Sequence, residues 1–307
     1  MDTAGRMAAA LAALGLRREE RVFVCMLDTL DWPVTFLGAL HAGVVPAAIN
    51  TLLTADDYAY MLEHSRAQAV FVSGALLPVV TQAMAKAAHE VRHVIVSRPT
   101  GPLPAGAHDF AALLAAQSGN APPPAATLAD DIAFWLYSSG STGRPKGTVH
   151  THGNLYATAE TYGLPVLGVR EDDVVFSAAK LFFAYGLGNA LTYTLAFGTT
   201  TILMAERPTP EAVFKRLKEH RPTIFYGVPT LFAMMVEVRR RFVVRLAHDR
   251  KLADEMRLFD AVESAQALLG REVRISARKP GRNPRERRLH PARSERTAKL
   301  AISAKSV

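Results

Sequence analysis

Tyr137-Ser-Ser-Gly-Ser-Thr-Gly-Arg-Pro-Lys-Gly147 is the stretch from which the fold and function of this chain can best be inferred. It follows a compact apolar run, residues 132–136, and precedes a polar segment, residues 148–154, so the pattern predicts a strand, a glycine-rich loop and a helix. Glycine permits positive φ angles and close approach of the backbone to a ligand, so that successive N–H groups can line one concavity. Such a concavity suits a polyphosphate, and Lys146 can add a charge-assisted hydrogen bond worth about 1.5–3 kcal/mol.

Three better-known glycine motifs do not fit this loop. A Walker loop requires Gly-Lys-Ser/Thr, but Lys146 lies between Pro145 and Gly147. A dinucleotide fingerprint requires glycine where Thr142 and Pro145 stand, and a nucleophile elbow requires glycine where Ser139 stands. A flexible Ser/Gly linker remains the ordinary alternative, although linkers rarely end in Pro-Lys-Gly directly after a buried-strand pattern.

The stretch resembles the phosphate-binding signature of the adenylate-forming acyl-CoA synthetases, the superfamily that also contains luciferases and peptide-synthetase adenylation domains. Residues 27–67 and 179–203 narrow the resemblance to the benzoate-CoA ligase branch, and it covers most of residues 1–236. By position, the resemblance implies that the ATP phosphates are bound by Ser138, Ser139, Gly140, Ser141, Thr142, Gly143, Lys146 and Gly147. It also implies an aryl pocket at Ala184, Tyr185 and Gly186, in which Tyr185 takes the place of an aromatic or histidine gate and Ala184 that of a small residue against the ring. Plain core packing is the alternative for these aromatic residues.

The resemblance implies an ATP-dependent aryl-CoA ligase. In that family a carboxylate attacks the α-phosphate of ATP with Mg2+, giving acyl-AMP and pyrophosphate, and the CoA thiolate then attacks the acyl-AMP. The expected cofactors and co-substrates are therefore ATP, Mg2+ and CoA, and the expected substrate is a small aromatic carboxylate. Catalysis of this kind relies on positioning and charge neutralisation, and no residue of this chain is assigned as a catalytic base or a metal ligand.

The chain alternates helical and extended patterns at the spacing of βαβ units. We expect an α/β fold with mostly parallel sheets flanked by helices, part of the large N-terminal domain of an acyl-CoA synthetase with an irregular basic tail. The expected strands are 22–27, 44–49, 69–73, 93–96, 132–136, 174–178, 199–204 and 223–226. The expected helices are 8–14, 32–42, 55–65, 76–90, 155–162, 190–197, 210–220 and 231–236, the third capped by Thr54 and the fifth by Asn154, which would aim its positive end at the phosphates.

Composition divides the chain further. We expect a first α/β subdomain at 1–98, a connecting segment rich in Pro, Gly and Ala at 99–129, a second α/β subdomain at 130–236 and a poorly ordered tail at 237–307. The net charge of +8 belongs to this tail, which contains 19 Lys/Arg and 9 Asp/Glu against 17 and 19 in the rest of the chain. No zinc spacing or aromatic-basic motif accompanies the charge, so no specific nucleic-acid partner is expected. The departure from the family pattern at Arg278-Lys279-Pro280 leads to the hypothesis that the tail is an out-of-frame or degenerate product.

The cysteine content, the N-terminal residues and the length of the apolar runs indicate the cellular compartment. A single cysteine, Cys25, excludes an internal disulfide and lies in an apolar strand pattern, where a thiol is usually inert packing. Asp2 interrupts the positive leader that a signal peptide would need, and no apolar run approaches the ~20 residues of a membrane span. We therefore expect a cytoplasmic protein without a membrane partner, in which His150 and His152 are structural, since no third metal ligand is near.

Several family parts have no counterpart in the sequence. These are a Thr-Glu motif, an adenine- and ribose-binding segment, a hinge, a C-terminal lid with its lysine and the segment that usually precedes Met1. We expect weak or absent turnover by this chain alone. The alternatives are a non-catalytic fragment that binds nucleotide or a partner, with self-association possible through exposed sheet edges, and an amidase-type hydrolase using Ser138 or Ser139. The hydrolase would need an upstream lysine, but Lys86 is the first in the chain.

Overall fold

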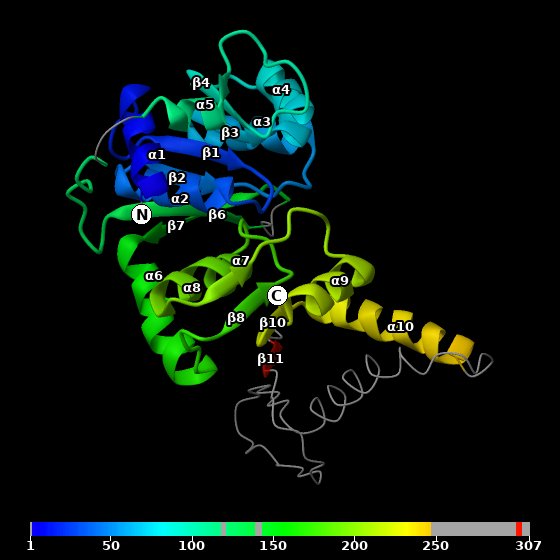
Figure 1. The fold of residues 1–307 in the computed structure, drawn as a ribbon. Coiled ribbons are helices and arrows are strands. Elements are labelled where there is room, and N and C mark those ends of the chain that lie inside the picture. Colours follow the sequence, from blue (N-terminus) through cyan, green and yellow to red (C-terminus); the bar gives the residue numbers. More distant parts are fainter. Residues whose placement is uncertain (1, 118–120, 139–142, 247–298, 303–307) are drawn as a thin grey trace. The chain divides into compact units, whose positions relative to one another are not determined.

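The computed structural model describes residues 2–117, 121–138, 143–246 and 299–302 (Figure 1). These residues form two compact units, each with its own sheet. The first unit comprises Met1–Gly168, Lys180–Ala196 and Leu203–Glu206, and the second comprises Val169–Ala179, Phe197–Ile202 and Arg207–Val307. The composition predicts a boundary at 99–129, but the two units are not divided there. The strand at 132–138, which follows this segment, pairs with the strand at 45–48 and so belongs to the same sheet as the strands before the segment.

The first unit is built on a seven-stranded sheet of order β5-β4-β3-β1-β2-β6-β7. All neighbouring strands are parallel except β6 and β7, which form an antiparallel hairpin. The strands are β1 (Arg21–Cys25), β2 (Val45–Ala48), β3 (Ala69–Ser73), β4 (His93–Ser97), β5 (His108–Asp109), β6 (Ile132–Ser138) and β7 (Lys146–Thr151). The mostly parallel α/β fold expected from the sequence is therefore confirmed.

Alternating side chains of β1 enter two separate cores, because successive residues of a strand point to opposite faces of a sheet. Val22 and Val24 lie in a cluster with residues of α1 (Asp2–Ala13), α2 (Asp31–His41) and α5 (Phe110–Ala115). Phe23 and Cys25 lie in a second cluster with residues of α3 (Ala55–Ser65) and α4 (Leu77–Lys86), which η1 (Gly74–Leu76) precedes. Burial raises the pKa of the Cys25 thiol to about 12, which agrees with an inert packing role.

Helix α3 begins where the sequence predicts, because Thr54 and Asp57 form a capping box. The Thr54 N–H donates to Asp57 Oδ2 at 3.1 Å, and the Asp57 N–H donates to Thr54 Oγ1 at 3.3 Å. The helix ends at Ser65, after which Arg66 adopts a left-handed conformation with φ of 52°. The capping box and the left-handed residue thus fix the two ends of α3, and with them which of its residues face the sheet.

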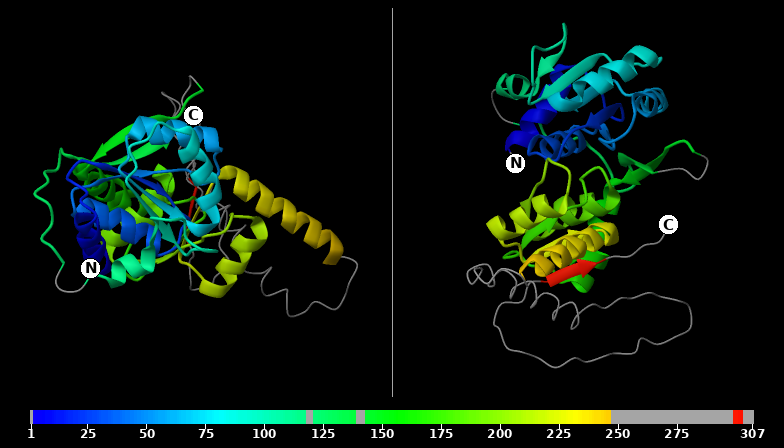
Figure 2. Two further views of the ribbon diagram at one scale, coloured as in Figure 1. Left: turned by 90° about the horizontal axis from the view of Figure 1, so that it is seen from above. Right: turned by 90° about the vertical axis from the view of Figure 1, so that its right-hand side faces the viewer.

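The segment after the glycine-rich loop is a strand, so the predicted order of strand, loop and helix is wrong. Residues Lys146–Thr151 form β7, which runs back along β6 and pairs Thr151 with Ile132 (Figure 2). Helix α6 (His152–Thr158) starts only there, with Thr151 rather than Asn154 as its N-cap. Its positive end therefore lies about 20 Å from the loop, at the opposite end of the hairpin, and cannot stabilise phosphates bound by the loop.

The rest of the first unit is helical, with two stretches of π-helix. These elements are η2 (Ala159–Leu167), α7 (Ala184–Leu187), η3 (Gly188–Thr192) and α8 (Tyr193–Phe197). The π-helical stretches η2 and η3 continue directly from α6 and α7. Such wide turns are rare and are often found at functional sites.

The second unit contains a parallel sheet of order β11-β10-β8-β9. Its elements are β8 (Val174–Ser177), β9 (Thr200–Ile202), α9 (Pro210–His220), β10 (Ile224–Gly227), α10 (Pro229–Leu246) and β11 (Lys299–Ile302). Asp173 is buried before β8, where its carboxylate accepts from Thr223 Oγ1 at 2.8 Å and from the Arg170 N–H at 2.9 Å. These contacts join the start of β8 to the start of β10.

The expected tail at 237–307 is only partly described. Helix α10 continues across residue 237 to Leu246, and β11 supplies an edge strand at 299–302. Residues 247–298 and 303–307, which include most of the basic segment, lie outside the described residues. None of the described helices combines the length and the apolar character that a membrane span requires.

We predict that Phe36→Ala destabilises the first unit by about 3–5 kcal/mol, because the change leaves a cavity at a fully packed position. Phe36 is 1% exposed, and its ring centroid lies 5.1 Å from that of Trp32 and 5.3 Å from that of Phe134, which joins α2 to β6. The measurement is the free energy of unfolding in urea. As a control, Leu30→Ala, at a side chain that is 70% exposed, should change it by less than about 0.5 kcal/mol; equal effects would contradict the packing.

Candidate functional site

The base of the predicted phosphate loop is the open end of the β6–β7 hairpin. Ser138 pairs with Lys146, Tyr137 pairs with Gly147, and the side chains of both Ser138 and Lys146 are exposed. Gly143 has a φ of 84°, a conformation that side chains rarely adopt, as expected for a glycine that shapes a ligand loop. The other predicted loop residues, Ser139, Gly140, Ser141 and Thr142, lie outside the described residues.

Helix α3 packs against this hairpin base. A Cβ atom on Gly147 would lie 3.3 Å from His64 Cε1 and 3.3 Å from Trp135 Cε3, so a larger residue would fit there only if these rings shifted by a few tenths of an ångström. His64 Nδ1 and Tyr137 Oη lie 2.9 Å apart and share a hydrogen bond. Sequence reasoning missed His64, because nothing in its local pattern indicates a contact with a residue 73 positions away.

The turn before β7 contacts the same helix. The Arg144 guanidinium lies 5.3 Å from the centroid of the Tyr60 ring, which is a cation–π contact. Tyr60 is four residues before His64, so the two side chains share one face of α3, with ring centroids 5.5 Å apart. Helix α3 thus contacts the chain on both sides of the loop, through Tyr137 before it and Arg144 after it.

The two histidines that follow the loop, His150 in β7 and His152 in α6, are partly buried. The His150 ring stacks on Phe134 with a centroid distance of 4.7 Å, and partial burial lowers the pKa of both His150 and His152. Across the described parts of the chain, no group of three or more potential metal ligands occurs. A structural role for the two histidines stays a prediction, supported for His150 by its contact with Phe134.

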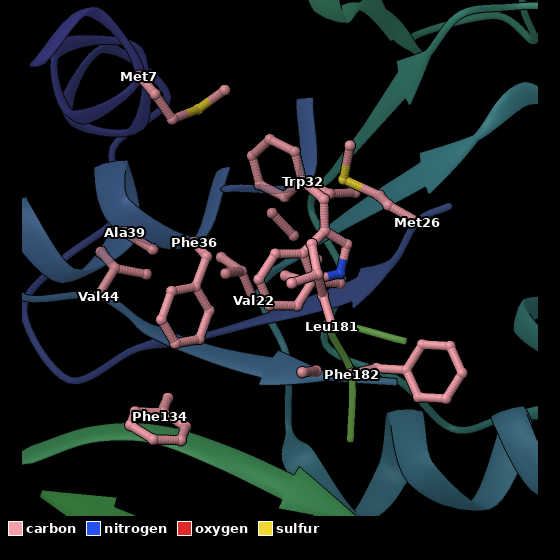
Figure 3. Close-up of a cluster of buried hydrophobic side chains, with 14 of the residues drawn as sticks. Met7, Val22, Met26, Trp32, Phe36, Ala39, Val44, Phe134, Leu181 and Phe182 are labelled. Atoms are coloured by element: carbon pink, nitrogen blue, oxygen red, sulfur yellow. The ribbon is translucent and has the colours of Figure 1, made fainter. Parts of the chain in front are cut away.

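The predicted aryl residues lie on α7, which one exposed residue separates from a buried pair. Leu181 and Phe182 lie in the same hydrophobic cluster as Met26 and Trp32 (Figure 3). The next residues emerge from this core, since Ala184 is exposed and Tyr185 half-buried, whereas Gly186 is buried again. Four residues beyond Tyr185, in η3, the buried Asn189 Nδ2 has no hydrogen-bond partner among the described residues.

A buried carboxylate holds the start of this segment. Asp28, which follows β1 and is 5% exposed, accepts from the Leu181 N–H at 3.3 Å through Oδ1 and at 3.2 Å through Oδ2. Burial raises the pKa of Asp28 to about 6, although the positive charge of Lys180 and the Leu181 hydrogen bond oppose this shift. Sequence reasoning missed Asp28; the available signal was an acidic residue just beyond the carboxyl end of a buried strand, where ligands of α/β sheets commonly bind.

The predicted phosphate loop and the predicted aryl segment are attached to one edge of one sheet. Strands β1, β2 and β6 are adjacent and parallel, so their carboxyl ends lie along the same edge. Asp28 follows β1 and holds Leu181, while Ser138 ends β6 two strands away. Two strand spacings correspond to about 10 Å, which is within the length of a small acid joined to a phosphate chain.

The chain matches a family of known enzymes over most of its length. The model of the family described as "AMP-binding enzyme" matches residues 1–279, which extends past the resemblance seen at 1–236. Benzoate--CoA ligase of Thauera aromatica is 57% identical over 223 residues, covering 73% of this chain and 41% of that protein. The 4-hydroxybenzoate--CoA/benzoate--CoA ligase of Rhodopseudomonas palustris is 50% identical over 236 residues, covering 76% of this chain and 42% of that protein.

Solved structures show the same fold. A benzoate CoA ligase from Burkholderia xenovorans LB400 superposes with a TM-score of 0.69 at 59% identity, covering 76% of this chain and 45% of that one. The anthranilate CoA ligase AuaEII, solved in complex with anthranoyl-AMP, gives a TM-score of 0.73 at 33% identity, covering 76% of this chain and 44% of that one. The chain thus spans less than half the length of these relatives.

We predict that the stability of the Asp28→Asn variant increases relative to that of the unchanged protein as the pH rises. The raised pKa means that the Asp28 carboxyl destabilises the folded state once it ionises, so its contribution to stability is lost as the pH rises from about 4 through about 6. The difference in free energy of unfolding between variant and unchanged protein should therefore shift by about 2 kcal/mol in favour of Asn between pH 4.5 and 7.5. Urea titrations at both pH values measure it, and a difference independent of pH would contradict the burial of this charge.

Proposed function

Because the chain belongs to the family of AMP-binding enzymes, we propose that it acts as an ATP-dependent aryl-CoA ligase. The reaction would join benzoate or a substituted benzoate to CoA through an aryl-AMP intermediate, with release of pyrophosphate. The observation that carries the proposal is the shared sheet edge, where the β6–β7 hairpin and the segment held by Asp28 are two strands apart. This edge would bring the acid and the phosphates within reacting distance of each other.

The hairpin would bind the triphosphate. Lys146 starts β7 with its side chain exposed beside Ser138, so its ammonium group can reach a phosphate without a large rearrangement of the backbone. The hydroxyl and N–H groups of Ser139, Gly140, Ser141 and Thr142 would complete the cradle by their place in the motif. Mg2+ typically binds through substrate phosphates and keeps several waters, so it would enter the site together with ATP.

Segment 184–186 would contact the aromatic ring. Ala184 leaves room where a larger side chain would project, and Tyr185 offers a flat face that can stack on a ring. The named activities of the two ligases from Thauera aromatica and Rhodopseudomonas palustris support an aromatic acid as the substrate class. The AuaEII complex with anthranoyl-AMP supports an aryl-adenylate as the intermediate. ATP and CoA are both available in the cytoplasm, which we propose as the site of action.

We predict that Lys146→Ala weakens ATP binding about 10–150-fold, because it removes one charge-assisted contact to a phosphate. Isothermal titration of the purified chain with Mg-ATP measures this change. The matched control is Lys86→Ala, which removes an exposed lysine of the same unit that pairs with Asp56 at 2.6 Å. Equal ATP affinity in the Lys146 variant and the unchanged chain would rule out the hairpin as the phosphate site.

Exchange of labelled pyrophosphate into ATP separates the ligase from the alternative of a non-catalytic nucleotide-binding protein. Exchange that requires benzoate shows that aryl-AMP forms reversibly, even where the overall reaction is slow. ATP binding without such exchange would favour the non-catalytic alternative. Addition of CoA and detection of benzoyl-CoA then tests the second half of the reaction.

We predict that Ala184→Leu lowers the affinity for benzoate at least about tenfold, because the added carbons occupy the space of the ring. The affinity for Mg-ATP should not change, since α7 is not part of the hairpin. Ala111→Leu, which adds the same volume to an exposed position of α5, serves as the control. Benzoate titrations in the presence of Mg-ATP decide the outcome, and unchanged benzoate affinity would remove Ala184 from the proposed pocket.

A further inference from the structure

We propose that Asp28 is a positioning residue for the aryl-acid site, because its buried carboxylate fixes the start of the segment that carries Ala184, Tyr185 and Gly186. The inference rests on the proposed function for the identity of the bound acid. The anchoring of this segment by Asp28 depends only on contacts within the first unit.

Helix α7 is the first turn of a longer helical run that η3 and α8 continue. The ends of helices fray most readily, because the first N–H groups have no partner within the helix. The position of Ala184 and Tyr185 therefore depends on what precedes them. On the preceding side, Leu181 and Phe182 fill the core beside Trp32, but apolar packing alone tolerates small slips in position (Figure 3).

The hydrogen bonds to Asp28 fix the position of this segment more closely than apolar packing does. Both carboxylate oxygens lie within hydrogen-bond reach of the one Leu181 N–H, which is three residues before Ala184. A hydrogen bond has strict distance and angle requirements, so it fixes the backbone in a way that apolar contacts do not. The peptide that leads into α7 is thereby tied to the end of β1, a central strand of the sheet.

Lys180 connects a third segment of the chain to Asp28 and Leu181. Its Nζ donates to the carbonyl oxygen of Glu206 at 2.7 Å and to that of Met204. Its charge also acts on the Asp28 carboxylate. The β1–α2 turn, the peptide before α7 and the segment after β9 are therefore connected through one buried acid and one lysine.

Stability does not explain why this carboxylate is buried. Taking an ionised carboxylate out of water costs more than one lysine and one N–H usually return, and apolar replacements of buried ion pairs are often neutral or stabilising. Ionisable groups buried at such a cost are concentrated at functional sites. A role in positioning the adjoining aryl segment accounts for a charge that the fold alone does not require.

Hydrogen–deuterium exchange on the full chain tests the hold directly. Asp28→Leu removes both acceptor oxygens, and we expect amide exchange in 181–187 to become at least about tenfold faster, with Asp28→Asn intermediate because it keeps one acceptor. Exchange in the hairpin, residues 132–151, should stay unchanged. The matched control is Asp31→Asn at the start of α2, three residues after Asp28, where the carboxylate accepts from Ser97 Oγ at 2.6 Å and from Arg98 Nε at 3.2 Å instead.

Two exchange results would overturn the proposal: unchanged exchange in 181–187 in both Asp28 variants, or an equal increase in 181–187 and 132–151, which would indicate general destabilisation. If Asp28→Leu does not fold, Asp28→Asn decides by the same comparison. Titrations provide the functional readout, because Asp28→Asn should weaken benzoate binding severalfold with Mg-ATP binding within about twofold of the unchanged chain. Unchanged benzoate affinity would also overturn the proposal. If the chain without substitutions binds no benzoate, the proposed function fails. Hydrogen–deuterium exchange still decides in that case whether Asp28 anchors the segment.

Discussion

The parallel pairing of β6 with β2 is the constraint on which the rest of the site depends. Ala47 pairs with Trp135 and Ala48 with Leu136, so a strand more than eighty residues later in the chain is added to the sheet of the first hundred residues. This pairing places the carboxyl end of β6 beside those of β1 and β2, and the loop that follows β6 starts at that edge. Without it, Ser138, which ends β6, would not lie at this edge.

Local sequence determined most helices and strands of the fold but not the hairpin. Strand β3 and helices α3 and α9 have the predicted bounds, because apolar periodicity, the cap Thr54 and the proline Pro210 at the start of α9 mark them within a few residues. Strand β7 was predicted as the polar lead-in to a helix, since its residues are largely exposed and show little apolar alternation. It is a strand because it pairs with β6, and pairing between strands is not visible in a window of local sequence. The extent of the first unit was missed for the same reason.

The site shows a similar division between what is local and what is not. A glycine-rich motif with a lysine is a continuous stretch, so the residues of the phosphate loop could be proposed from their spacing. The residues that support the two segments could not, because Tyr137 is bound by a histidine 73 positions earlier and Leu181 by an aspartate 153 positions earlier. Both supports, α3 and the turn after β1, belong to the first unit. Contacts of this kind follow from the fold and can be recognised only after it is known.

The central claim is that the hairpin of this chain recognises the phosphates of ATP. Competition between Mg-pyrophosphate and ATP for the purified chain tests it most directly, because pyrophosphate carries the groups that the loop would bind and lacks the adenosine. The account predicts that pyrophosphate displaces bound ATP competitively and completely. ATP that stays bound at saturating pyrophosphate, or a chain that binds neither compound, would contradict it.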